Sequence, residues 1–351
     1  EYPFSVAIQY QTHWDQLQRL YIDINHMIDI NVLPKNIREL RFSNTWDLYD
    51  DLTLPDSLTK LTFGKKNYKS IQDLGLPENL KELEFGPRYN KPLFDENGHR
   101  YLPDGLVKVS FGKKFNQQFV NLELERVLPD GLMSINFDMN SEFNQPLIPH
   151  VFPDSLICLS FGAKFNQPLT ENVFPNSLKY LALGGMFNQP LVPGIFPDSL
   201  IYLVFSGGFN RPLLPNTLPR LLTSIIFGHD FNQPLLPGIL PDSLTHLEFG
   251  AQFNQPLLPN VLSGSLTSLR FGSDIDAQFN QPLLPSTLPG SLTSLRFGRN
   301  FNQPMLPGIL PDSLTYLEFG DRFNQSLLPN VLPGPGSLNS LVLGGDFNQP
   351  L

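Results

Sequence analysis

The residue types that most often carry catalysis or bind metals are scarce and scattered in this chain. Its six histidines stand at positions 13, 26, 99, 150, 229 and 246, and none belongs to a His-Glu-x-x-His motif or has a partner at metal-ligand spacing. The chain also has no Gly-x-Ser-x-Gly nucleophile motif and no Gly-x-x-x-x-Gly-Lys phosphate-binding loop. We therefore expect no catalytic residues, no metal site and no cofactor, and we interpret the protein as a non-enzyme.

Three local features could still do chemistry, and each has a simpler explanation. Cys158 could be a reactive thiol, but no His or Lys is placed beside it to favour the thiolate. Asp274 and Asp276 could suggest a calcium site with Asp230, yet two carboxylates in a loop are more often simply hydrated. The string Phe-Gly-Lys-Lys, which begins at 63 and 111, is basic beside a glycine but does not form a phosphate loop motif. None of the three alters the expectation of a non-enzyme.

Charge and composition limit the kinds of partner and cellular location that we expect. The 351 residues include 33 acidic and 24 basic side chains, a net charge of −9, which disfavours nucleic acid as a partner. There is no apolar run of about 18 residues, so we expect no membrane-spanning segment. No charged-then-apolar leader is visible either, so we expect an intracellular (cytoplasmic) or virion-associated protein that is not obviously secreted.

The 34 prolines and 29 phenylalanines indicate opposite kinds of structure unless both follow a regular order along the chain. So much proline is typical of disorder, whereas so much phenylalanine is typical of a packed interior. Two markers supply the order. The string Phe-Asn begins at 115, 143, 165, 187, 209, 231, 253, 279, 301, 323 and 347, mostly 22 residues apart. The pattern Leu-x-x-Leu-x-Phe accompanies it in 14 units, the first ending at Phe42, with a degenerate copy at Leu17, Leu20 and Ile22.

Each part of the repeat predicts a local structure. Leu-x-x-Leu-x-Phe is too short for a helix, and its last three residues alternate with strand period. The return limb carries about three prolines in ten residues, which exclude a helix interior and favour an extended chain. Gly250 and its equivalents are expected to permit the turn that ends each strand. A single coil cannot bury its apolar face, so the coils must stack.

The predicted fold is therefore mainly β: a parallel β solenoid with 22-residue coils and a proline-rich, helix-poor convex side. We expect one continuous repeat domain over residues 36–351, preceded by a cap or degenerate first coil over 1–35. The asparagine of each Phe-Asn pair should form a buried ladder that pairs main-chain groups at the corner between strand and return limb. Its members are Asn116, Asn144, Asn166, Asn188, Asn210, Asn232, Asn254, Asn280, Asn302, Asn324 and Asn348.

These repeats resemble a known family. Leu-x-x-Leu-x-Phe with a downstream asparagine is similar to leucine-rich repeats, and the unit from Phe231 to Leu244 resembles the FNIP repeat, known from social amoebae and from giant viruses of amoebae. The resemblance implies a leucine-rich-repeat-like fold with Asn254 five rather than three residues after Phe249. Some family members carry an N-terminal F-box, which would imply substrate recruitment to a ubiquitin ligase. Residues 1–35 do not show a three-helix F-box pattern, so that role applies only if an F-box precedes Glu1.

The outward-pointing strand residues are the candidate functional positions, because the repeat requires only the inward residues to be apolar. Most of the outward residues are polar, but those of the middle coils are not. A contiguous apolar patch on the concave face is a candidate contact surface. The alternative is that these side chains simply cover one another. The predicted partner-binding patch comprises Ile157, Cys158, Tyr180, Ile201, Tyr202, Val204, Ile226 and His246.

Two classes of function follow. The first is a protein-protein interaction scaffold that uses the concave face, with a partner that the sequence does not identify. The second is a structural component of a giant-virus particle or assembly. Self-association through the end coils is a further option in either class.

Overall fold

A computed structural model describes residues 16–22, 33–42, 53–65, 70–272, 276–328, 330–334 and 336–350. The candidate calcium ligand Asp274 lies outside these ranges. The chain divides into two compact units, each of which is described by itself. Unit 1 comprises Glu1–Phe165 with Asn172–Leu178, and unit 2 comprises Asn166–Glu171 with Lys179–Leu351.

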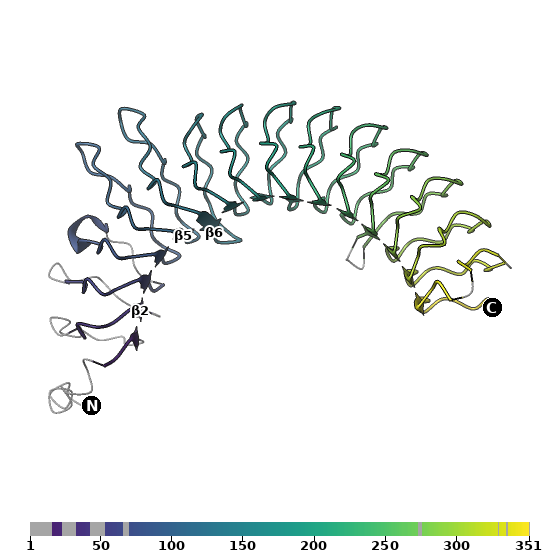
Figure 1. Ribbon diagram of the computed structural model, residues 1–351, viewed down its shortest axis with the longest axis horizontal. Helices are drawn as coiled ribbons and strands as arrows, with labels where there is room; N and C mark the ends of the chain where they lie inside the picture. The colour runs from purple at the N-terminus through teal and green to yellow at the C-terminus, as the bar shows by residue number, and fades with distance from the viewer. Residues whose placement is uncertain are drawn as a thin grey trace. The chain divides into compact units, whose positions relative to one another are not determined.

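The described part of the chain contains fifteen short strands, one for each unit of the strand pattern and one for the degenerate copy (Figure 1). Unit 1 holds β1 (Arg19–Ile22), β2 (Glu39–Phe42), β3 (Lys60–Thr62), β4 (Glu82–Glu84), β5 (Lys108–Phe111), β6 (Ser134–Phe137) and β7 (Cys158–Ser160). Unit 2 holds β8 (Tyr180–Leu183), β9 (Tyr202–Phe205), β10 (Ser224–Ile226), β11 (His246–Phe249), β12 (Ser268–Phe271), β13 (Ser294–Arg296), β14 (Tyr316–Glu318) and β15 (Ser340–Val342).

Within each unit, every strand pairs in parallel with the strand of the next coil. Equivalent repeat positions meet across the ladder, as Leu61 meets Leu83 and Leu247 meets Leu269. One short 3-10 helix, η2 (Gln72–Leu74), is the only helix in the described ranges, and the return limbs are extended. The predicted parallel β solenoid with a helix-poor return side is confirmed.

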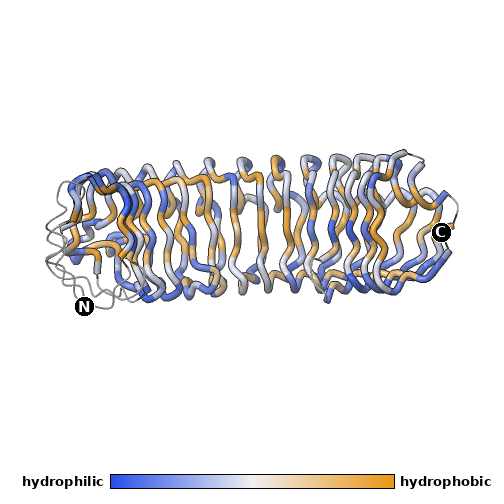
Figure 2. The backbone as a smooth tube through the Cα atoms, turned by 90° about the horizontal axis from the view of Figure 1, so that it is seen from below, coloured by the Kyte–Doolittle hydropathy of each residue, from blue (hydrophilic) through white to orange (hydrophobic). Residues whose placement is uncertain are grey.

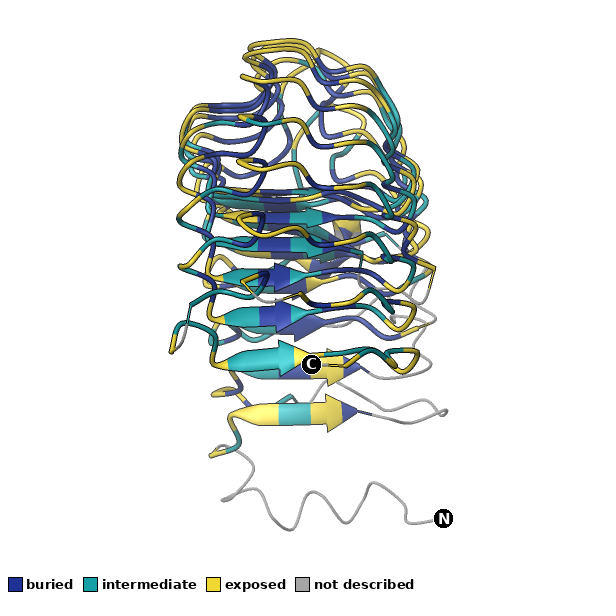
Figure 3. Ribbon diagram, turned by 90° about the vertical axis from the view of Figure 1, so that its right-hand side faces the viewer, coloured by how far each residue is buried: buried dark blue, intermediate teal, exposed yellow. Residues whose placement is uncertain are grey.

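The core consists of columns of identical residues. The second residue of each strand is buried, with the exceptions of Leu20 in β1 and Leu341 in β15, which are half-buried (Figure 3). Hydropathy repeats at the same place in successive coils (Figure 2). The ring of Phe249 stacks on that of Phe253 in its own coil, with 3.8 Å between the ring centres. It also stacks on Phe227 and Phe271 of the neighbouring coils, with 5.7 and 5.5 Å between ring centres. Since burial of one such ring stabilises a protein by roughly 1.5–3 kcal/mol, these columns are a principal source of stability.

A glycine column allows the coils to approach closely after most of the strands. A Cβ atom built on Gly250 would lie 1.9 Å from the carbonyl oxygen of Gly228, and one on Gly320 would lie 2.0 Å from that of Gly298. Neither Gly250 nor Gly320 has a positive φ. At these two positions any side chain would collide with the backbone of the preceding coil, so close approach and not a left-handed turn explains the glycine. The equivalent Gly272 does have a positive φ, 67°, as expected for a turn.

The left-handed backbone conformation recurs on the return limb, seven residues after the Phe of most Phe-Asn pairs. Gly238 has φ 83° there, and Asn216 and Asn260 have φ 63° and 64°. Glycine and asparagine are the residues that adopt this conformation at least cost. The same position is occupied by His150, Asn172, Gly194, Ser286, Gly308 and Asn330, all with positive φ.

The asparagine ladder is present, and most rungs involve a glutamine as well, whereas Arg211 takes its place beside Asn210. The N–H of Asn280 donates to Oδ1 of Asn254 at 2.9 Å, and Nε2 of Gln281 donates to the same oxygen at 3.2 Å. In unit 2 the ladder runs without a break from Asn166 to Asn348. In unit 1 it links Asn90, Asn116 and Asn144.

The predicted burial of the ladder is wrong. Its asparagines are half-buried, and Asn144 and Asn348 are exposed. The side chains lie along the edge of the coil stack, where water reaches their outer side.

Hydroxyl groups form a further ladder before several of the strands. Thr245 Oγ1 donates to the carbonyl oxygen of Thr223 at 3.1 Å, and Thr267 Oγ1 donates to that of Thr245 at 3.1 Å. The serine of each Pro-x-Ser-Leu segment does the same, as Ser243 Oγ donates to the carbonyl oxygen of Leu222 at 2.7 Å. Before the strand, side chains thus pair main-chain carbonyl groups of the preceding coil. After the strand, asparagine side chains pair main-chain N–H groups of the next coil.

We predict that Asn254→Ala lowers the free energy of unfolding by about 1–2 kcal/mol. The substitution removes the oxygen that accepts from Asn280 and Gln281, while water can replace part of the loss because the site is half-buried. Thermal and urea unfolding measure the change. Asn339→Ala, at an exposed position, is the control and should be neutral. Equal stability of the two variants would contradict a stabilising ladder.

We predict that Gly250→Ala destabilises the chain by about 2–3 kcal/mol, because the new methyl group overlaps the Gly228 carbonyl group. Gly264→Ala is the matched control, since no atom lies within 4 Å of the Cβ position at Gly264. That substitution should be neutral or stabilise by up to about 1 kcal/mol. A comparable loss in both variants would show that general glycine flexibility, not close contact between coils, explains the column.

Candidate protein-interaction surface

The strand face is the surface formed by the outward-pointing strand residues, which the sequence analysis placed on the concave side. In unit 2, Tyr180 of β8 meets Tyr202 of β9 in register, and Val204 of β9 meets Ile226 of β10. Tyr180, Tyr202 and Ile226 are 36%, 49% and 37% exposed. These four residues, which we call the apolar face, are therefore neighbours that remain open to solvent.

The remaining predicted patch residues have different positions. Ile201 is half-buried and directly precedes Tyr202, at the edge of the apolar face. His246 is exposed on β11, where it meets Ser224 in register and lies 2.8 Å from Thr245 Oγ1 through Nδ1. Ile157 and Cys158 are half-buried and belong to unit 1, where Cys158 meets Ser134. Their membership of the same patch stays a prediction.

Beyond β11 the strand face of unit 2 becomes charged. Arg270 Nε lies 3.9 Å from Glu248 Oε1, and Arg296 Nε lies 3.7 Å from Glu318 Oε2. The guanidinium carbon of Arg296 lies 4.7 Å from the centre of the Tyr316 ring, and Tyr316 Oη donates to Glu318 Oε2 at 2.5 Å. That hydrogen bond raises the pKa of Tyr316. A hollow of about 300 Å³ extends from Arg270 and Arg296 towards the glycine corners of β13 to β15.

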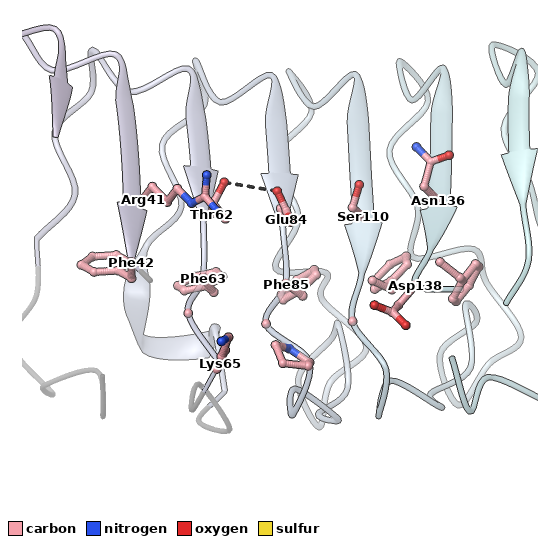
Figure 4. Close-up of a pocket in the computed structure, with 16 residues that line it drawn as sticks. Arg41, Phe42, Thr62, Phe63, Lys65, Glu84, Phe85, Ser110, Asn136 and Asp138 are labelled. Carbon is pink, nitrogen blue, oxygen red and sulfur yellow. Dashed lines mark hydrogen bonds between the residues drawn. The ribbon is translucent and has the colours of Figure 1, made fainter. Parts of the chain in front are cut away.

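The strand face of unit 1 is polar. A hollow of about 370 Å³ runs along it, lined by outward side chains such as Arg41, Glu84 and Asn136 (Figure 4). Thr62 Oγ1 donates to Glu84 Oε2 at 3.4 Å in this hollow. Ion pairs connect neighbouring strands, as Lys60 Nζ lies 3.3 Å from Glu82 Oε2. The two units therefore offer chemically different strand faces.

Sequence reasoning missed a second apolar surface in unit 2. The second leucine of Pro-Leu-Leu-Pro points outward from each return limb, and Leu236 is 56% exposed. The signal was present, because the first leucine alone suffices to fill the core, as Leu235 does at 2% exposure. We call this set the leucine column: Val192, Leu214, Leu236, Leu258, Leu284, Leu306 and Leu328.

The described residues hold no group of three or more His, Cys, Asp or Glu side chains arranged as metal ligands. Over the same ranges, no helix has the length and hydropathy needed to cross a membrane.

The fold defines the class of protein as a leucine-rich-repeat-like parallel β solenoid. The FNIP Repeat family matches residues 25–66, 49–86, 67–114, 121–164, 143–186, 165–208, 187–230, 209–252, 231–274, 279–322 and 301–335. The chain belongs to the FNIP repeat family, as its Phe-Asn pairs indicate.

Solved structures agree with this assignment. The giant-virus protein CroV588, described as a circular leucine-rich-repeat protein, is 42% identical over 92% of this chain, with a TM-score of 0.83. The chain spans 45% of the length of CroV588. An internalin (inlF) from Listeria monocytogenes is 16% identical over 99% of this chain and 92% of its own, with a TM-score of 0.50, and shows the fold alone. No protein of curated function matches the chain.

We predict that Glu318→Gln lowers the pKa of Tyr316 towards that of an ordinary tyrosine. The carboxylate of Glu318 accepts a hydrogen bond from the phenol group of Tyr316, and this bond keeps Tyr316 protonated to higher pH. Titration of the Tyr316 ring signals by NMR measures the change, with Glu84→Gln in unit 1 as the control. An unchanged Tyr316 titration in Glu318→Gln would exclude the interaction in solution.

Proposed function

We propose that the chain is a non-enzymatic protein-interaction scaffold that binds a protein partner through the apolar face of unit 2. The observation that carries the proposal is the exposure of Tyr180, Tyr202 and Ile226 at strand positions where the fold has no need of apolar residues. Solenoids of this class present long surfaces of this kind. An intracellular or virion-associated location is part of the proposal.

The physical argument rests on the cost of solvent-exposed aromatic surface. Tyrosine buries a large ring with few rotatable bonds and keeps a polar hydroxyl, so it is enriched at the centres of protein interfaces. Polar residues on β11 and β12, namely His246, Glu248 and Arg270, lie at one side of the apolar face and would form its rim. An apolar centre with a polar rim is the usual anatomy of a binding surface.

A structural role in a giant-virus particle is the second candidate. The observation that favours it is the 42% identity to CroV588. The two roles differ in where the chain is found: a particle component copurifies with particles, whereas a free scaffold is recovered with its partner from the cell.

We predict that Tyr180→Ala with Tyr202→Ala weakens partner binding at least about thirtyfold, since truncation of a central aromatic anchor costs about 2 kcal/mol or more. The probes are peptides of about 12 residues, long enough to cross β8 to β13 when extended, selected from a random displayed library on the wild-type chain. Fluorescence anisotropy measures their affinity.

Two controls interpret the result. The melting temperature of the double variant should be close to that of the wild type, because both rings point away from the core. Leu236→Ala, in the leucine column, should bind the selected peptides as the wild type does. Undiminished binding by the folded double variant, or loss of binding in Leu236→Ala alone, would overturn the proposal and move the contact to the return limbs.

A further inference from the structure

Two arginines stand side by side on the strand face of unit 2. In the pairing of β12 with β13, Arg270 meets Arg296, and Ser268 meets Ser294 two residues earlier. Side chains two residues apart on a strand share one face, so two guanidinium groups and two hydroxyl groups form a block. All four residues are half-buried and open to solvent on their outer side. We call them the Arg-Ser block.

Like charges directly opposite each other on paired strands destabilise a sheet. The carboxylates that offset this repulsion lie on the outer sides of the pair, Glu248 on β11 and Glu318 on β14. Each ion pair runs from a single Nε atom over 3.9 or 3.7 Å, which is longer than a hydrogen bond. An arginine has five N–H donors, so most donors of both guanidinium groups are left for a ligand between them.

One side chain of the pair, that of Arg296, is also held in position. Arg296 lies over the Tyr316 ring at 4.7 Å, and Tyr316 is fixed in turn by its hydrogen bond to Glu318. A guanidinium group with a fixed orientation loses less entropy when it binds a carboxylate. The block therefore combines local positive charge, free donors and a fixed geometry.

We propose that the Arg-Ser block binds the carboxylate of an aspartate or glutamate in the protein segment that covers the apolar face. The inference rests on the proposed function and adds the chemistry of the partner. The outward side chains form two rows about 7 Å apart, which suits one extended chain better than a helix about 10–12 Å wide.

The strand spacing sets the position of the acidic residue in the partner. Tyr202 on β9 is three strands from Arg270 and four from Arg296. At roughly 4.8 Å between strands and 3.3 Å per extended residue, the acidic residue lies about four to six positions from the one on Tyr202. The partner segment thus contains an apolar residue, which contacts Tyr202, and one acidic residue about four to six positions before or after it.

A carboxylate fits the block better than a phosphate group does. Arg270 and Arg296 carry two positive charges, and Glu248 and Glu318 carry two negative charges immediately beside them. A ligand with one negative charge is attracted by the two arginines and is only modestly repelled by the two glutamates. A phosphate group carries nearly two negative charges, so both flanking carboxylates repel it more strongly.

The test uses the library-selected peptides with four chains: wild type, Arg270→Gln with Arg296→Gln, Tyr180→Ala with Tyr202→Ala, and Arg220→Gln. Arg220 is an exposed arginine of unit 2 that pairs with Asp198 at 3.1 Å outside the strand face. Each peptide is compared with its Asp→Asn (or Glu→Gln) and phosphoserine versions.

We expect peptides selected on the wild type to carry an acidic residue at the stated spacing, and its conversion to the amide to weaken binding about tenfold or more. The double variant Arg270→Gln with Arg296→Gln should bind the acidic peptide and its amide version with equal affinity. The variant Arg220→Gln should prefer the acidic peptide as strongly as the wild type does. Added salt should reduce the discrimination.

The outcomes separate the two proposals. Peptides that need both tyrosines but show no acidic preference, or a preference that survives in Arg270→Gln with Arg296→Gln, overturn this inference and leave the proposed function intact. Tighter binding of the phosphoserine peptide overturns the carboxylate assignment. Selected peptides that bind Tyr180→Ala with Tyr202→Ala at full strength overturn the proposed function itself.

Discussion

The structure depends on close, in-register contact between successive coils. Gly250 shows how close the contact is, because a Cβ atom there would lie 1.9 Å from a carbonyl oxygen of the preceding coil. The same register superposes the phenylalanine columns and aligns each asparagine with the main chain of the next coil. No coil could bury its rings or pair its corner amides alone, so stability depends on the contacts between coils as well as on those within each coil.

This constraint divides the residues into two classes. Inward strand residues, corner glycines and ladder amides recur in most coils, because each contacts its equivalent in the next coil. Outward strand residues contact solvent and can vary. Variation on the strand face therefore carries functional information: polar and charged side chains in unit 1, and in unit 2 an apolar face on β8 to β10 followed by the Arg-Ser block on β12 and β13.

The repeat makes the fold predictable from the sequence, because a 22-residue period indicates which positions are equivalent. The strands, the phenylalanine columns and the asparagine ladder follow from that equivalence. Equivalence does not reveal how near two positions lie in space. The close approach at Gly250 and the second donor, from Gln281, are therefore visible only in the structure. Nor does equivalence reveal exposure: the half-buried ladder and the leucine column both depend on which side of the chain faces water. The apolar residues of the strand face and the succession of Arg270 and Arg296 follow from that equivalence too, but the ion pairs with Glu248 and Glu318 and the contact with the Tyr316 ring do not.

The central claim is that the apolar face serves a partner and contributes little to folding. A scan of all substitutions over residues 179–272, read out by resistance to proteolysis, tests it without knowledge of the partner. We predict that substitution of Tyr180, Tyr202 or Ile226 by Ser, Thr or Gln causes little loss of stability. Almost every substitution of Leu181, Phe205 or Gly250 should destabilise the chain. Equal sensitivity of the outward and inward positions would contradict the account and show that the outward side chains stabilise the fold by covering one another.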